Sequence, residues 1–295
     1  MNKKLLLVVI VVIEICLYLF INPSIKQRLK HTIDINRYPN IDNIKLDNYV
    51  IGVVAAEMPA TFSFEALKAQ AVASRTFIYR KIIDGNISYD YLNHDKGQAY
   101  LSNEELKERW KNNYDMYYNI IKKAVTDTKG EIITYNSNPI KAYYFSSSNG
   151  VTEDSKYVFG EESYLISVDS SFDKDSKEYE KEILIDKKSF YQKLELNDSV
   201  LKIDNVERNR TNHIEKITIN DKLYSGIEIR KKLGLRSTDF DISVNNDNVK
   251  IITRGYGHGV GMSQYGANYL ASNGKTYKEI INYYYNDVNI TKIQV

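Results

Sequence analysis

Apolar and polar residues follow two different periods along this chain. Between about Asp47 and Val125, apolar residues recur every three or four positions, which is the spacing of one face of an α-helix. Asp47 stands at the expected N-cap of a first helix that runs through Val50 and Val54. Ser63 stands at the expected N-cap of a second helix. The first half of the chain is therefore predicted to be helical.

From Gly130 onward the pattern is that of β-strands. EIITY and KAYYF, joined by NSNP as a turn, precede the strand-like segments KEILID, HIEKITI, DISV and VKIITR. Ser225 and Glu228 form a capping box for a short helix that ends at Gly234, and a glycine-dense segment leads into a final Tyr-rich helix. Helices followed by strands favour an α+β fold. We predict a single mixed helix/strand domain over residues 41–295, strand-rich at about 130–254.

The chain has a long apolar run near its start, LLLVVIVVIEICLYLFI at residues 5–21. At about 1.5 Å per residue the run spans roughly 25 Å, the short end of a bilayer crossing. A cleaved signal peptide is the alternative, but no small-x-small cleavage site precedes Asn22 and the run is longer than a usual signal-peptide core. We expect a membrane-anchoring helix at 1–21 and a polar stalk at 22–40. Basic residues flank the run on both sides, so charge does not fix its orientation.

Charge and cysteine content exclude some classes of function. Lys and Arg number 40 against 38 Asp and Glu, which gives no basic face for a nucleic acid. Cys16 is the only cysteine and lies in the predicted anchor. The remaining chain therefore has neither disulfides nor a thiol nucleophile.

Glu57 is a carboxylate in an apolar setting. It shares one helix face with Val50 and Val54, and Pro59 is expected to end the helix just after it. Partial burial and the negative end of the helix dipole both disfavour a carboxylate, so both should raise its pKa. A protonated glutamic acid can serve as a general acid on a glycosidic oxygen. An ion pair with Arg75 inside the fold is the alternative reading.

Four segments resemble a known family. EMPATFSFEALKAQAVASRTF (57–77), YYFSSSNGVTEDS (143–155), SGIEIRKKLGLRSTDF (225–240) and GYGHGVGMSQYGA (255–267) are similar, in this order, to the stage II sporulation protein D (SpoIID) family, which also includes the amidase enhancer LytB. The resemblance implies a lytic transglycosylase that cuts peptidoglycan glycan strands, stripped of their stem peptides, during forespore engulfment. It also fits an N-terminal anchor.

The resemblance assigns roles to single residues. Glu57 matches the family's catalytic glutamate, which would protonate the leaving oxygen and then deprotonate the sugar's 6-hydroxyl, giving a 1,6-anhydro product. Glu65 is expected to act as a helix cap instead of a second acid. Arg75 matches a recurrent arginine that would orient the sugar or its N-acetyl group, with a structural ion pair as the alternative.

Polar residues of the later segments are candidates for binding the glycan. Small hydrogen-bonding groups after a strand, an amide, and a tyrosine that would stack on a sugar ring are expected to line one groove: Ser146, Ser147, Asn149, Gln264 and Tyr265. His258 lies in GYGHGVG, which matches neither the dinucleotide nor the phosphate-loop motif. We expect His258 to contact the substrate and its neighbouring glycines to permit close backbone approach.

No metal or other cofactor is expected. Some relatives bind zinc through His and Cys in the loop after the second helix, where this chain has YLNHDKGQAY. His94 and Asp95 are present, but Gly97 stands where the cysteine would precede Gln-Ala. These residues fall short of a four-ligand zinc site.

Two functions remain open at this stage. The first is a lytic transglycosylase in the cell membrane, with one span and its catalytic domain outside the cytoplasm, on the mother-cell side of the engulfing septum. Its expected partners are a partner amidase and membrane engulfment proteins of the SpoIIP/SpoIIM type. The second is a non-catalytic, peptidoglycan-binding enhancer of an amidase. Retention of Glu57 favours the enzyme.

Overall fold

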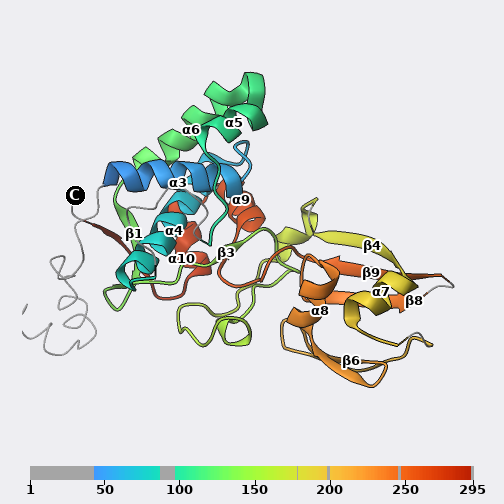
Figure 1. The fold of residues 1–295 in the computed structure, drawn as a ribbon. Helices are drawn as coiled ribbons and strands as arrows, with labels where there is room; N and C mark the ends of the chain where they lie inside the picture. The colour runs from blue at the N-terminus through green and yellow to red at the C-terminus, as the bar shows by residue number, and fades with distance from the viewer. Residues whose placement is uncertain (1–42, 87–96, 178, 198–199, 245–246, 294–295) are drawn as a thin grey trace, which may run out of the picture.

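The computed structural model describes residues 43–86, 97–177, 179–197, 200–244 and 247–293 (Figure 1). The predicted anchor and stalk lie outside the described residues. Within the described ranges, no helix combines the length and the apolar character that a membrane crossing requires. The fold is a mixture of helices and strands, as the α+β prediction has it. The described elements form a helix lobe and a strand lobe (Figure 1).

The helix lobe is built around one central helix, α4 (Phe64–Ile83). Its alanines, among them Ala69 and Ala73, are fully buried, because small side chains let neighbouring elements approach closely. The neighbours are the helices α3 (Asn43–Glu57), α6 (Tyr114–Asp127), α9 (Gln264–Ser272) and α10 (Tyr277–Tyr284) and strand β1 (Glu131–Tyr135). Helix α5 (Asn103–Trp110) packs on α6. Strand β1 lies between β11 (Asn289–Lys292) and β2 (Asn138–Pro139) in an antiparallel sheet.

The strand lobe holds two antiparallel three-stranded sheets. One has the order β4-β9-β8 and the other β5-β6-β7. Helices α7 (Lys187–Leu194) and α8 (Gly226–Leu233) lie between them (Figure 1), with α7 on β4 and β9 and α8 on β6 and β7. The strands are β4 (Glu180–Asp186), β5 (Ile203–Arg208), β6 (Ile214–Ile219), β7 (Lys222–Ser225), β8 (Asp239–Val244) and β9 (Asn248–Arg254).

The buried apolar side chains form two clusters, one in each lobe. Leu67, Val72 and Ile133 belong to the first, and Phe190 and Ile251 to the second. Each sheet of the strand lobe buries only one of its faces. Helices α7 and α8 pack between the two buried faces, one from each sheet, and so enclose a separate core. The described residues thus have two apolar cores, and the single mixed domain over residues 41–295 stays a prediction. Because β1 to β3 belong with the helices, the strand lobe runs from Glu180 to Arg254.

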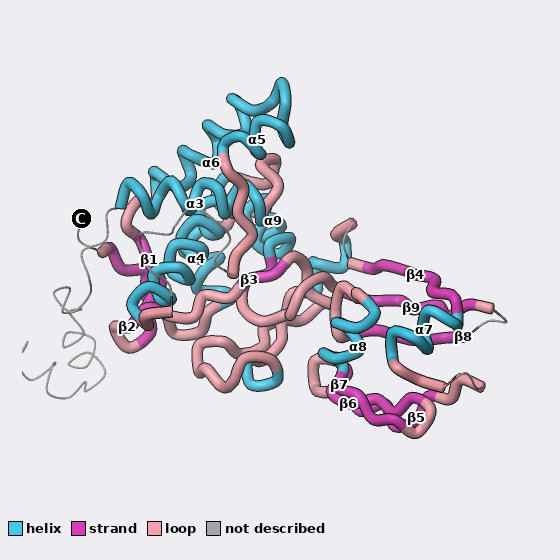
Figure 2. The backbone as a smooth tube through the Cα atoms, in the orientation of Figure 1, coloured by secondary structure: helices cyan, strands magenta, loops and turns pink. Residues whose placement is uncertain are grey.

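Loops join the two lobes, as Figure 2 shows in pink. Strand β3 (Tyr144–Phe145) pairs in parallel with β10 (Met262–Ser263), so the chain leaving the helix lobe lies beside the chain returning to it. Ser147 forms an antiparallel bridge with Tyr256. The segment that leads from the helix lobe to the strand lobe is therefore hydrogen-bonded to the segment that leads back, at the base of the strand lobe.

Several local predictions are confirmed and others need correction. Ser225 caps α8, and Gly234 ends it in a left-handed conformation. Asp47 is not an N-cap, because α3 already begins at Asn43 and the carboxylate pairs with Arg75. Ser63 does precede α4, but its hydroxyl contacts Ser272 instead of capping the helix. The final helix is two helices, since Thr276 forms a capping box that starts α10.

Candidate functional site

A cleft of about 710 Å³ lies where the two lobes meet. Helices α3 and α4 supply one side, and α8 with the glycine-dense loop supplies the other. The residues that line it are Ala56, Glu57, Phe77, Lys81, Gly97, Gln98, Tyr143, Tyr144, Phe145, Ser146, Phe159, Arg230, Tyr256, Gly257, His258 and Gln264.

Glu57 is the last residue of α3, as predicted from Pro59. Its side chain is half-buried at the cleft, and its Oε1 accepts a hydrogen bond of 2.7 Å from the backbone N–H of Ala99. The segment that carries Ala99 lies against α3 because Gly52 has no side chain: a Cβ there would overlap the Tyr100 ring. Leu101 N–H also donates to Gly52 O. The carboxyl group is thus held by a backbone donor from a separate segment.

A chain of polar side chains lies beneath Glu57. The Tyr144 hydroxyl donates to Gln98 Oε1 over 2.7 Å and also bonds to Ser74. Gln70 donates to Ser74 Oγ over 3.0 Å, and Gln264 lies 3.5 Å from Gln70 Oε1. Burial, and then the nearby Glu57 carboxylate, raise the pKa of Tyr144 well above its usual range. Tyr144 therefore remains a hydrogen-bond donor at neutral pH.

His258 is a neutral part of the cleft wall. Its Nδ1 accepts the Val260 N–H over 3.1 Å, and the ring also bonds to the backbone of Tyr144. Burial, and then the positive charge of Arg230, lower the pKa of His258 to about 4. Its ring stands edge-on to Phe159 at 4.9 Å between ring centres. Phe159 in turn stacks on Tyr143 at 4.1 Å, which makes an aromatic wall.

The glycine-dense loop packs closely on β3 and on the residue before it. Gly257 and Gly261 have φ of +126° and +81°, a region that other residues rarely adopt. A Cβ on Gly257 would lie 2.6 Å from Phe145 Cβ, and one on Gly261 would overlap the Tyr143 carbonyl oxygen. As predicted, these glycines permit close approach, and the partner here is neighbouring backbone and side chain.

Comparison with known proteins places the chain in a family. Residues 35–135 match the family described as Stage II sporulation protein (SpoIID). Stage II sporulation protein D of Bacillus subtilis (strain 168) is 43% identical over 265 residues, covering 86% of this chain and 76% of that protein. The chain belongs to the stage II sporulation protein D family. The family predicted from the four sequence segments is therefore confirmed.

Two further relatives show how the similarity varies within related proteins. Stage II sporulation protein D of Bacillus amyloliquefaciens is 42% identical over 267 residues, 86% of this chain and 76% of that protein. The Amidase enhancer of Bacillus subtilis (strain 168) is 27% identical over 297 residues, covering 81% of this chain and 40% of that protein. The similarity to stage II sporulation protein D is thus higher in both identity and coverage.

The cleft brings together four of the eight site residues predicted from the family resemblance, namely Glu57, Ser146, His258 and Gln264. The other four lie outside its lining. Ser147 is buried beside Ser176, with 3.2 Å between the hydroxyl oxygens. Tyr265 sets its ring edge-on to Phe62 at 5.1 Å.

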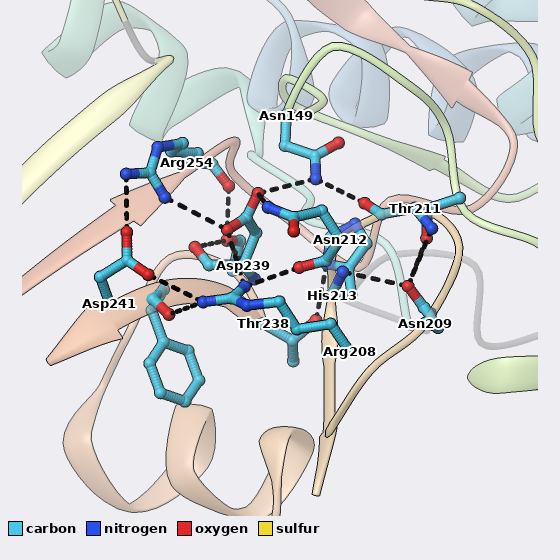
Figure 3. Close-up of polar contacts among 12 residues, drawn as sticks. Asn149, Arg208, Asn209, Thr211, Asn212, His213, Thr238, Asp239, Asp241 and Arg254 are labelled. Atoms are coloured by element: carbon cyan, nitrogen blue, oxygen red, sulfur yellow. Dashed lines mark hydrogen bonds and ion pairs between the residues drawn. The ribbon is translucent and has the colours of Figure 1, made fainter. Parts of the chain in front are cut away.

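Asn149 belongs to a buried polar network that joins the lobes (Figure 3). Its Nδ2 donates to Thr211 O and to Asp239 Oδ2, each over 2.8 Å. Asp239 Oδ1 also accepts from Arg208 at 3.2 Å and from Arg254 at 3.4 Å. Asn149 therefore fastens the loop after β3 to the strand lobe.

Arg75 is fully buried inside the helix lobe. Its Nε and Nη2 donate to Asp47 Oδ1 over 3.1 and 2.9 Å. Its Nη1 and Nη2 also donate to the carbonyls of Thr128 and Val125. These contacts tie α4 to α3 and to the end of α6, which corresponds to the structural alternative considered from the sequence.

Several cleft residues were not singled out from the sequence. Tyr143 and Tyr144 stand in YYFSSSNG, and Arg230 stands in SGIEIRKKLG, so both family-like segments contained the signal. Gln98 lies in the stretch that was read only for zinc ligands. His94 and Asp95 lie outside the described residues, and no group of three or more potential metal ligands occurs in the part of the chain that is described. The absence of zinc stays a prediction.

Proposed function

We propose that this protein is a lytic transglycosylase that cleaves the glycan strands of peptidoglycan, stripped of stem peptides, during forespore engulfment. The observation that carries the proposal is Glu57, a carboxylate at the cleft whose Oε1 is held by the Ala99 N–H. Among the described residues that line the cleft, Glu57 is the only carboxylate. A reaction that needs one carboxylate fits this lining better than one that needs two.

The reaction proceeds in two proton transfers through Glu57. The protonated carboxyl gives its proton to the glycosidic oxygen as the bond from this oxygen to C1 of N-acetylmuramic acid breaks. The resulting carboxylate then accepts the proton of the same sugar's 6-hydroxyl, and O6 bonds to C1. The product carries a 1,6-anhydro ring, Glu57 regains its proton, and no water is consumed.

The walls of the cleft suit a polysaccharide. The stacked rings of Tyr143 and Phe159 form an aromatic wall against which a sugar ring can pack, while Ser146, Gln98 and Gln264 supply hydrogen-bonding groups. The buried chain from Tyr144 to Gln70 keeps the two glutamines in place. The side chains that would contact the substrate are thus supported from beneath, which favours a fixed geometry for acid catalysis.

The decisive test is Glu57→Gln in the full chain, assayed by mass spectrometry of products from amidase-treated sacculi. A general acid-base group contributes about 10²–10⁴-fold, so anhydro products should fall by at least the upper part of that range. The matched control is Glu108→Gln, which removes an exposed carboxylate from α5. Unchanged anhydro-product formation by Glu57→Gln would contradict the proposal.

The alternative function is enhancement of a partner amidase, which the similarity to the Amidase enhancer favours. The same Glu57→Gln protein separates the two functions. An enhancer would stimulate a purified amidase on intact sacculi equally well with Glu57 or Gln at this position. An enzyme would lose anhydro products in that experiment.

We also propose that residues 1–21 anchor the protein in the cell membrane and that residues 22–40 form a stalk. The catalytic lobes would then act outside the cytoplasm, on the mother-cell side of the septum, beside a partner amidase and membrane engulfment proteins of the SpoIIP/SpoIIM type. The apolar run at 5–21 and the peptidoglycan substrate support this placement. Recovery of protein that begins near Asn22 from the soluble fraction would contradict it.

A further inference from the structure

Arg230 is a cation at the cleft for which the protein supplies no anion among its described residues. It lies on α8 in the strand lobe, half-buried in the cleft wall, and its Nε donates to Leu235 O over 3.4 Å. No carboxylate of the described residues lies within ion-pair distance of it, whereas Arg75, Arg208 and Arg254 each pair with an aspartate.

This unpaired state has a free-energy cost. Burial lowers the pKa of Arg230, and among the described residues the Tyr256 phenol opposes that shift but no carboxylate does, whereas Asp47 opposes it for Arg75. A guanidinium withdrawn from water without a counter-ion is destabilised until an anion arrives. The other cleft cation, Lys81, lies over the Phe77 ring at 4.7 Å and is a point charge. Among the described residues of the lining, Arg230 alone offers the planar donor fork that matches a carboxylate.

The substrate of the proposed function carries one suitable anion. In peptidoglycan, N-acetylmuramic acid bears a lactyl ether whose carbonyl is an amide as long as the stem peptide is attached. Removal of the peptide leaves a free carboxylate, while N-acetylglucosamine has none. The stripped strand therefore presents a carboxylate on every second sugar.

We propose that Arg230 binds this free lactyl carboxylate and thereby makes the protein selective for strands without stem peptides. The inference rests on the proposed function, since it names the group that this cleft recognises. A strand that still carries peptides places a neutral amide beside the guanidinium, so the charge stays unpaired. The reaction that must come first is the hydrolysis of the lactyl amide.

Two substrates that differ only at this group test the inference. Amidase-treated strands are compared with the same strands after their lactyl carboxylates are coupled to methylamine, which restores a neutral amide. A charge-assisted bidentate pair supports a preference of about 10- to 100-fold in kcat/KM for the free carboxylate. Full-length wild type should show this preference.

Three variants assign the preference to Arg230. Arg230→Met should lose activity on the free-carboxylate strands and act on both substrates alike, while Arg230→Lys should keep part of the preference. Lys231→Met, which removes an exposed charge from the next position of α8, should behave as wild type. Thermal melting of each variant verifies folding, and the lysine variant keeps the test valid if the methionine variant does not fold.

Binding separates this inference from the proposed function. Fluorescence anisotropy of labelled strands with Glu57→Gln should show the same preference without cleavage. Preferential binding by a wild type that never releases anhydro products would overturn the proposed function but retain carboxylate recognition. Equal cleavage of both substrates by wild type, or a preference that persists in Arg230→Met, would overturn the inference itself.

Discussion

The Ala99 backbone N–H donates a hydrogen bond of 2.7 Å to Oε1 of Glu57. The donor comes from a segment 42 residues farther along the chain, which packs on the helix that ends with this glutamate. A backbone donor cannot rotate away as a side chain can. The orientation of the carboxyl group therefore depends on how closely that segment approaches α3.

Gly52→Ala should disturb this approach. In most helix interiors the change stabilises by about 1 kcal/mol, but here the new Cβ would meet the Tyr100 ring and lie 2.7 Å from Leu101 O. We expect the segment to shift and kcat to fall by about 10- to 100-fold, because small misplacements of catalytic groups are costly. Steady-state kinetics check this. Asn48→Ala, at an exposed position of the same helix, is the control.

Tyr144→Phe removes the donor to Gln98 Oε1 and the bond to Ser74. Leaving buried polar groups without a partner should lower the free energy of unfolding by about 1–3 kcal/mol. Because Gln98 precedes Ala99, kcat should fall as well. Urea unfolding and kinetics on the same preparation measure both effects. Wild-type stability and rate in the variant would show that the polar chain does not support the site.

Arg75→Met should act on stability and leave the chemistry intact. Loss of one partner of a buried pair costs about 3–5 kcal/mol, since Asp47 and three carbonyls lose their donor. The rate per folded molecule should stay unchanged. A double-mutant cycle with Asp47→Asn isolates the pair. A stable Arg75→Met protein with a raised KM would instead assign the arginine to substrate binding.

Acid should weaken the fold through His213. Burial holds the pKa of His213 at about 4, and its Nε2 lies 3.9 Å from Glu153 Oε2. Below about pH 6.5 the unfolded chain binds a proton that the folded protein takes up only near pH 4, so stability present above pH 6.5 declines by up to about 3 kcal/mol as the pH falls.

The His213 effect is measured as a difference between two proteins. Burial raises the pKa of Glu153, so the protonation of Glu153 increases the free energy of unfolding as the pH falls, opposite to the effect of His213. Urea unfolding of wild type and His213→Gln between pH 7 and pH 4 removes that shared contribution. The variant should lose less stability than wild type over this interval. Parallel curves would show that His213 does not titrate as its burial implies.

Elements with complete local signals were predictable from the sequence. Ser225 and Gly234 define α8, and alternation defines β4 and β9. Elements that depend on distant partners were not. Strand β11 exists because it pairs with β1, Glu131 lying opposite Lys292, and no local pattern encodes such a pairing. The two-residue strands β3 and β10 depend on each other in the same way.

The residues of the candidate site also differ in how far local sequence predicts them. The position of Glu57 at the end of a helix was predictable, because the apolar helix face that it extends and the proline that ends the helix lie within a few residues of it. Arg230 reaches the cleft from another lobe, so only the folded chain shows it beside His258. Arg75 and Asn149 stand in family-like segments, yet their donors bind carboxylates and carbonyls inside the protein. A polar residue in a family-like motif can thus serve to hold the fold together without contacting a substrate.

The strand lobe begins and ends at one point on the molecule. Glu180 pairs with Arg254, and the Gly255 N–H donates to Tyr179 O over 2.6 Å. Topologically the lobe is an insertion into the helix lobe, closed at its own base. Evolution, or a protein engineer, can lengthen or exchange such an insertion without rerouting the chain around Glu57. Under the proposed function, bond cleavage and the choice of strand would then be encoded by separate parts of one gene, which can diverge at different rates.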